Sequence, residues 1–299
     1  MGRKSRIMLG TVLALAMVLS VLVAAGCGTT NYTGVTGQNK LALSGSTTVL
    51  PVAQEAANEF MKANKGITVN VQGGGSSVGI QNVTQGTVDI GDSSRDLQAT
   101  ETSAGLVDHK IAYDIVDIIV NPGSVQVKNL SMDQIKNILS GKVTDWSQVG
   151  GSPGKITVFV RDSASGTRDM IDSKVLGKGT PTAVTNVAGA TELNSNGLMK
   201  QNVASTKGSI GYISSGYADK TVAAVNVGDV VPNLDNAVSG KYVLSRWLHM
   251  FTKGQPNPLS QKFIDFVLTP AFQNGPLAKD YIPVSKVPGG TGSSSATGK

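Results

Sequence analysis

The 299-residue sequence is poor in the residues that build disulfides, metal sites and aromatic clusters. It contains one cysteine and two histidines, and phenylalanine, tryptophan and tyrosine together make up 5% of the chain. A lone cysteine forms no internal disulfide, and neither His109 nor His249 lies at a metal-ligand spacing from cysteine, aspartate or glutamate. The chain also lacks a GxxxxGKS or GxxxxGKT nucleotide loop and a GxSxG nucleophile elbow. We therefore expect no metal, no cofactor and no enzyme activity.

The N-terminus has the parts of a secretory signal peptide. Basic residues precede an apolar stretch over residues 7–25, and small residues follow directly before Cys27. This pattern predicts a signal peptide over residues 1–26; an uncleaved transmembrane anchor is the alternative, because the stretch is just long enough to span a bilayer. The small residues resemble the lipobox of bacterial lipoproteins, although Ala24 stands where that pattern prefers leucine. We expect a lipid on Cys27 to anchor the mature chain to the cell membrane, outside the cytoplasm.

The charge is mildly positive. The formal net charge is +6, of which the predicted signal peptide carries three positive charges and no negative one, so the mature chain has +3. These charges are too few and too dispersed for a nucleic-acid partner. A content of 40% hydrophobic and 15% charged residues is typical of a soluble α/β protein.

Strand-like and helix-like segments alternate between a Gly- and Thr-rich tether at 27–40 and a similar tail at 289–299, both predicted to be flexible. Such alternation favours mostly parallel sheets covered by helices, and the amount of sheet favours two domains. We predict strands at 41–44, 67–72, 88–91, 114–122, 155–160, 208–213 and 242–252, and helices at 49–61, within 73–86, at 131–139 and at 257–270.

At three places a predicted strand ends, hydroxyl and glycine residues follow, and a helix begins. These are SGSTTV at 44–49, GGGSSVG at 73–79 and SASGTR at 163–168. A helix N-terminus has unpaired N–H groups and about +0.5 charge, so it favours an anion, and hydroxyls add donors there. The alternative is plain N-capping without a ligand. Three such openings together favour anion binding.

Two arginines follow predicted strands and could pair with an oxyanion. Arg161 ends the ITVFV strand, at the edge where open α/β sheets bind ligands, and Arg95 occupies the equivalent place in VDIGDSSRDL. The alternative is a surface ion pair with Asp162 or Asp96. Three aspartates are expected to cap and solvate strand ends rather than to form a carboxylate pair: Asp92, Asp114 and Asp117.

Five motifs resemble those of the phosphate-binding proteins of bacterial phosphate ABC transporters, in the shorter lipoprotein form. In order they are LSGSTTVLPVAQ, VQGGGSSVGIQNVTQGTVDIGDSSR, IKNILSGKVTDWSQVGG, VFVRDSASGTR and GSIGYISSGY. The resemblance runs from about residue 40 to 288. It implies a type II periplasmic-binding-protein fold, with lobe one at 41–119 plus 244–288, lobe two at 120–243, and two crossing segments as a hinge.

The same resemblance implies a phosphate site in the cleft between the lobes. Carried over onto this chain, its residues are Thr47, the Thr48 backbone, Ser76, Ser94, Arg161, Ser165, Gly166 and Thr167, and the residue patterns add Ser46 and Arg95. Two positions depart from the family. Ser94 stands where the longer branch has an aspartate that accepts a phosphate proton, which leaves Asp92 or Asp162 as candidate acceptors. Trp247 replaces a proline, with an expected effect on hinge geometry only.

These observations predict a lipid-anchored extracytoplasmic receptor, monomeric as a binding unit, that binds inorganic phosphate and delivers it to an ABC permease. A receptor for sulfate, molybdate or another tetrahedral oxyanion is the alternative, because a site made only of donors does not exclude sulfate. An extracellular phosphatase would need a metal cluster or a nucleophile and base pair, and a surface adhesin or sensor partner would make no use of the three helix openings.

Overall fold

The computed structural model describes residues 39–177 and 190–290. The predicted signal peptide, Cys27, nearly all of the tether and residues 291–299 of the tail lie outside these ranges. Within them, no helix combines the length and apolarity needed to cross a bilayer. The described residues, 39–177 and 190–290, belong to one compact unit.

The first half of the fold is the predicted βαβαβ arrangement. Strand β1 (Lys40–Gly45) pairs in parallel with β2 (Thr68–Gly73) on one side and with β3 (Ile90–Ser93) on the other, and helices α1 (Leu50–Ala63) and α2 (Ser76–Gln85) connect them. Gly45 pairs with both Gly73 and Asp92, so all three strands end at one edge of the sheet. The segments that follow these strands therefore meet there.

Two long strands cross the middle of the molecule. Strand β4 (Leu106–Val120) pairs along its first part with β10 (Ser245–Lys253), and along its second part with β8 (Ser209–Ser214) and β9 (Ala223–Val227). The sequence predicts only the second, mostly apolar part of β4. Its first part alternates buried and exposed residues, so its sequence is only partly apolar and we did not predict it as a strand.

Every antiparallel pair of named strands involves β4 or β10, and the remaining pairs are parallel, as predicted. The remaining elements are β5 (Asn129–Leu130), α3 (Met132–Leu139), β6 (Thr157–Arg161), α4 (Gly166–Ile171) continued by a π-helical turn (Asp172–Leu176), β7 (Thr191–Leu193), α6 (Asn196–Ser205), α7 (Leu234–Val238), α8 (Pro258–Val267) and α9 (Pro270–Asn274). Helix α3 begins at the predicted capping box of Ser131 and Gln134.

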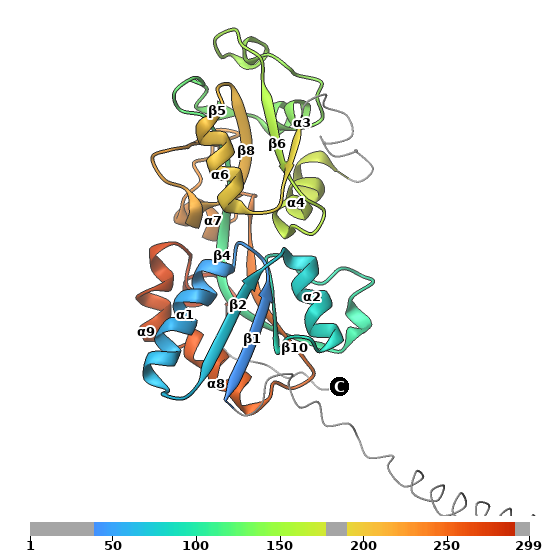
Figure 1. The fold of residues 1–299 in the computed structure, drawn as a ribbon. Helices are drawn as coiled ribbons and strands as arrows, with labels where there is room; N and C mark the ends of the chain where they lie inside the picture. The colour runs from blue at the N-terminus through green and yellow to red at the C-terminus, as the bar shows by residue number, and fades with distance from the viewer. Residues whose placement is uncertain (1–38, 178–189, 291–299) are drawn as a thin grey trace, which may run out of the picture. The chain divides into compact units, whose positions relative to one another are not determined.

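Two large apolar cores define two lobes, as the type II periplasmic-binding-protein fold requires. Lobe one packs around Leu41, Phe60 and Phe263, with α1, α8 and α9 on one side of its sheet and α2 on the other (Figure 1). Lobe two packs around Ile135 and Tyr212, with β5, β6, β8 and helices α3, α4, α6 and α7. Because β4 contributes to both cores, it connects the lobes.

Candidate anion-binding site

Hydroxyls from three separate segments of lobe one meet at the sheet edge. Ser46 Oγ donates to Ser94 Oγ at 3.0 Å, and Ser76 Oγ lies 3.3 Å from Ser94 Oγ. The backbone N–H of Ser94 donates to Ser76 Oγ at 3.0 Å, and that of Thr48 donates to Ser46 Oγ at 3.1 Å. All four residues are buried. The sheet register thus assembles a cluster that the sequence motifs only suggest.

The helix openings distinguish capping from anion binding. The N-cap residues of helices α1 and α2 are Val49 and Gly75, and neither helix has a side-chain cap, so the hydroxyls near them do not serve as caps. In contrast, Ser165 Oγ accepts from the N–H of Arg168 at 3.2 Å and caps α4. Plain N-capping therefore explains the hydroxyl at the start of α4. The hydroxyls near the starts of α1 and α2 are not used as caps and remain available to bind an anion.

Gly166 lets lobe two approach the hydroxyls of lobe one. A Cβ atom at this position would lie 2.6 Å from Ser76 Oγ and 2.8 Å from Ser94 Oγ, closer than real side chains come. At Gly75, whose φ of +99° also disfavours a side chain, a Cβ would lie 2.6 Å from the carbonyl oxygen of Ala164. Thr167 follows Gly166, and its Oγ1 lies 3.5 Å from Thr48 Oγ1. The two glycines thus allow close contact between the hydroxyl-rich segments 73–79 and 163–168.

Arg161 is a buried cation held by neutral groups. Its side chain donates from Nε to the carbonyl of Leu193 at 3.1 Å, and from Nη2 to the carbonyl of Asn194 at 3.2 Å and Thr47 Oγ1 at 3.3 Å. The residue is 1% exposed, and Nη1 is buried with no partner among the described residues. Burial lowers the pKa of Arg161, and the nearby Asp162 carboxylate opposes that shift. A buried charge with neutral partners is unfavourable without a counter-ion, so this geometry favours an anion.

Arg95 lies near the hydroxyls but directs its guanidinium elsewhere. Its Nη1 and Nη2 donate to the two carboxylate oxygens of Glu101 at 2.7 and 2.8 Å, and Nη2 also donates to Ser77 Oγ at 3.1 Å. The Glu101 carboxylate thus neutralises Arg95 through a bidentate pair. The other nine predicted site residues lie where the two lobes face each other, whereas the Arg95 side chain pairs with Glu101.

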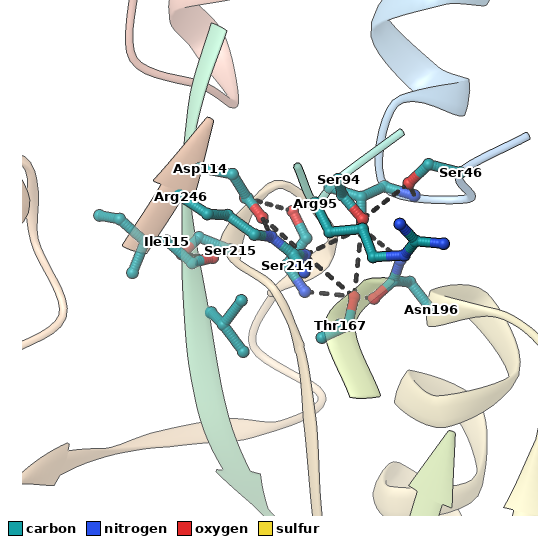
Figure 2. Close-up of polar contacts among 12 residues, drawn as sticks. Ser46, Ser94, Arg95, Asp114, Ile115, Thr167, Asn196, Ser214, Ser215 and Arg246 are labelled. Atoms are coloured by element: carbon teal, nitrogen blue, oxygen red, sulfur yellow. Dashed lines mark hydrogen bonds and ion pairs between the residues drawn. The ribbon is translucent and has the colours of Figure 1, made fainter. Parts of the chain in front are cut away.

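Arg246 is a second guanidinium in the cluster, and the sequence analysis did not select it. Nη2 donates to Thr167 Oγ1 at 2.9 Å and to Thr48 Oγ1 at 3.2 Å, and Nε and Nη2 donate to Asp114 Oδ2 at 3.1 and 3.0 Å. Figure 2 shows Arg246 reaching from Asp114 toward Thr167. The available signal was an arginine and an aspartate inside otherwise apolar strands, because buried charges need partners.

Asn196 is the other residue that sequence reasoning missed. It is fully buried at the start of α6, and its Nδ2 donates to Thr47 Oγ1 at 3.2 Å and to Thr48 Oγ1 at 3.1 Å. Two tyrosines hold the same loop, because Tyr217 donates to the carbonyl of Thr47 at 2.6 Å and Tyr281 to that of Thr48 at 2.8 Å. Nothing near Asn196 in the sequence distinguishes it from an ordinary residue at a helix start.

The expectation that three aspartates solvate strand ends is wrong, because Asp92, Asp114 and Asp117 are all buried. Both carboxylate oxygens of Asp92 are buried without a partner among the described residues, and burial raises its pKa well above the ordinary value. Asp162 has one such oxygen, Oδ1. Neither candidate proton acceptor has a described hydrogen bond to the hydroxyl cluster. Across residues 39–177 and 190–290, no group of three or more His, Cys, Asp or Glu side chains could hold a metal ion.

Comparisons with known proteins place this geometry in a family. A family model described as "PBP superfamily domain" matches residues 30–271. The chain is 33% identical to the phosphate-binding protein PstS of Bacillus subtilis over 288 residues, which cover 92% of this chain and 94% of that protein. This chain belongs to the PstS-like family of phosphate-binding proteins. It is also 32% identical to PstS of Borreliella burgdorferi, with 78% of this chain and 86% of that protein covered.

Solved structures agree with the fold of this PstS-like protein. One, from Clostridium perfringens, is assigned as a phosphate ABC transporter substrate-binding protein and contains bound phosphate; its TM-score is 0.77 at 34% identity, covering 82% of this chain and 99% of that one. An ABC-type phosphate transport receptor from Vibrio cholerae gives a TM-score of 0.67 at 31% identity, covering 81% and 99%. The relatives named here are binding proteins rather than enzymes.

Trp247, the second departure from the family motif, packs beside the crossing strands. Its ring lies edge-on to Tyr113 of β4 with centroids 5.1 Å apart, and the ammonium of Lys110 lies 5.0 Å from its centroid. The adjacent Arg246 carries the contacts to the hydroxyl cluster. In this PstS-like chain, Trp247 thus packs on β4, whose two ends belong to different lobes.

Proposed function

We propose that this protein binds inorganic phosphate between its two lobes and delivers it to an ABC transporter permease for import. The observation that carries the proposal is Arg161, a buried guanidinium of lobe two held by neutral groups, which include the Thr47 hydroxyl of lobe one. A dianion there would supply the missing negative charge. The named relatives, which include a phosphate-bound structure, support phosphate as the ligand.

The proposed contacts come from both lobes. Lobe one contributes Ser46, Thr47, Thr48, Ser76 and Ser94, and lobe two contributes Arg161, Ser165, Gly166 and Thr167. We add Arg246 and Asn196 to this set and assign Arg95 to its pair with Glu101. About eight hydrogen bonds to a charged group contribute roughly 12 to 24 kcal/mol, and association costs about 4 to 15 kcal/mol. A micromolar complex requires a binding free energy of roughly 8 kcal/mol. These contacts can therefore supply micromolar affinity without a metal.

The proposed lobes span 41–119 plus 244–288 and 120–243, and they close by a hinge at the crossing segments. Ile115 and Val116 belong to the core of lobe two, which supports a crossing point in β4 near Asp114, slightly before residue 119. Contacts to one ligand from both lobes would favour the closed state.

We further propose a lipid on Cys27 after removal of residues 1–26, with residues 27–40 as a tether on the outer side of the membrane. In this arrangement the protein is a monomeric receptor that presents its ligand to the permease and does not turn it over. Mass spectrometry of the membrane-associated protein tests the lipid, because an unmodified Cys27 would contradict the anchor.

Calorimetry of phosphate binding to the chain lacking residues 1–27 tests the function directly. We expect micromolar or tighter binding, and no detectable heat would contradict the proposal. A sulfate or molybdate receptor is the second candidate, since no carboxylate makes a described hydrogen bond to the cluster hydroxyls. Competition with arsenate, sulfate and molybdate ranks these ligands. Turnover of a chromogenic phosphate ester would instead indicate a phosphatase.

A further inference from the structure

The carbonyl of Thr47 has no donor in its own helix. Residues 47–49 form a turn that runs into α1, and a carbonyl in such a turn accepts from the N–H four residues later. The N–H of Leu50 donates in this way to the carbonyl of Ser46 at 3.0 Å. The residue four positions after Thr47 is Pro51, which has no N–H. Because Thr47 is buried, its carbonyl needs a donor from another part of the chain.

That donor comes from lobe two. Tyr217 Oη donates to the carbonyl of Thr47 at 2.6 Å, and no other described hydrogen bond reaches this oxygen. The ring of Tyr217 packs against a core cluster of lobe two that includes Ile213 and Val222. Burial raises the pKa of Tyr217 to about 12, so the hydroxyl keeps its proton at neutral pH. Tyr217 is therefore a donor that one lobe holds in place and directs at the backbone of the other.

The next carbonyl of the same turn has a donor from its own lobe. Tyr281 Oη donates to the carbonyl of Thr48 at 2.8 Å, and Tyr281 belongs to the apolar core of lobe one. The two tyrosine bonds thus differ in one respect. The Tyr281 bond lies within lobe one and is kept when the lobes separate, whereas the Tyr217 bond crosses between the lobes and must then break.

The bond from Tyr217 fixes the peptide group that joins Thr47 and Thr48. The carbonyl of Thr47 and the N–H of Thr48 belong to one planar unit. The N–H donates to Ser46 Oγ at 3.1 Å, and the carbonyl accepts from Tyr217. With both ends bonded, the plane cannot rotate, and it carries both threonines of the proposed phosphate site. When the lobes separate, only the N–H end keeps its bond.

Gly216 permits this close approach of the lobes. A Cβ atom at Gly216 would lie 2.8 Å from Cζ and 2.9 Å from Oη of Tyr281. Tyr281 is 6% exposed, so its ring has little room to move away. Lobe two therefore packs directly against Tyr281 at the residue that precedes Tyr217.

We propose that Tyr217 is a positioning residue for phosphate binding: from lobe two it supplies the donor that Pro51 lacks, and it fixes the Thr47–Thr48 peptide of lobe one only while the lobes are closed. This inference rests on the proposed function and adds a residue that acts through the backbone of Thr47. Because the bond forms on closure and breaks on opening, its contribution lies in the rate of phosphate release.

Release of radiolabelled inorganic phosphate tests this, using full-length protein in a non-ionic detergent chased with unlabelled phosphate. Calorimetry gives Kd, and the association rate follows from the two values. We expect Tyr217→Phe to raise the release rate about two- to tenfold, the net effect of one hydrogen bond. The association rate should stay within about twofold, because phosphate enters before the lobes close. An unchanged release rate overturns the inference.

Tyr242→Phe is the matched control. Tyr242 Oη donates to the carbonyl of Val116 at 2.8 Å, and both residues belong to the core of lobe two, so this bond does not cross between the lobes. The variant should lower the free energy of unfolding and leave the release rate at the wild-type value. An equal rise in the release rate of both variants would mean that loss of any buried tyrosine hydroxyl has this effect, and the inference would be wrong.

Pro51 provides a test that a merely structural tyrosine would not pass. Pro51→Ala restores an N–H four residues after Thr47, which can donate to the same carbonyl. In this background Tyr217→Phe should change the release rate by less than about twofold, because the carbonyl keeps a donor. Fully additive effects of the two substitutions would contradict the role assigned to Tyr217.

Gly216→Ala tests the same contact with both tyrosines intact, and it decides the question if Tyr217→Phe does not fold. We expect phosphate release at least about tenfold faster, because the added methyl group keeps the lobes apart. Gly154→Ala, where a Cβ atom would meet nothing within 4 Å, should release phosphate like the wild type. If the wild-type protein binds no phosphate, the proposed function fails. Phosphate binding with wild-type release rates in Tyr217→Phe and Gly216→Ala overturns the role of Tyr217 alone.

Discussion

Among the described residues, Arg161 is the one guanidinium of the site without a hydrogen bond to a carboxylate, and replacing it by alanine removes that charge. In the wild-type chain it is 1% exposed and donates to two carbonyls and to Thr47. We expect Arg161→Ala to weaken phosphate binding by about 2 to 5 kcal/mol, the range for truncating one partner of a buried charge pair. This corresponds to a roughly 30- to 5000-fold increase in Kd, which titration calorimetry measures directly.

Arg95→Ala is the matched control for this experiment. Arg95 is also a buried arginine that follows a lobe-one strand, but Glu101 pairs with it at 2.7 Å. Its loss should lower the free energy of unfolding and leave phosphate Kd within about twofold, the usual scatter for a site without ligand contact. Arg161→Lys should recover part of the affinity, because lysine restores the charge without the planar fork. Unchanged affinity in Arg161→Ala, or an equal loss in Arg95→Ala, would remove Arg161 from the site.

Other parts of the structure lead to further predictions. Gly166→Ala places a methyl group 2.6 Å from Ser76 Oγ. We therefore expect at least about tenfold weaker phosphate binding with little change in melting temperature. The control is Gly154→Ala, where a Cβ atom would meet nothing within 4 Å, and this variant should bind phosphate like the wild type. Burial raises the pKa of Asp117 to about 7, above an unfolded value of about 3.9. The stability from its neutral form is therefore complete below the unfolded pKa and is lost as pH rises toward 7. Denaturant titrations should show Asp117→Asn flattening that decline, and an unchanged pH slope would contradict the assignment.

Much of the fold follows from local patterning. The period of apolar residues locates the βαβαβ segment, α8 and the apolar half of β4, and the capping box marks the start of α3. Hydroxyls placed after strands predict a shared edge, because parallel strands end together. For this reason Ser46, Ser76 and Ser94 could be grouped before any coordinates were known.

By itself, the sequence determined the order of elements, the hydroxyl motifs, and Arg161 and Arg95 as candidate cations at strand ends. Only the tertiary structure decided which charges are neutralised. Glu101 forms an ion pair with Arg95, and Asp114 forms one with Arg246. Arg161 has no described hydrogen bond to a carboxylate. Likewise, Asn196 reaches Thr48 across 148 positions and Arg246 reaches it across 198. The reason is physical: local patterns encode backbone conformation and burial, whereas the pairing of buried polar groups depends on which distant segments the packed core brings together.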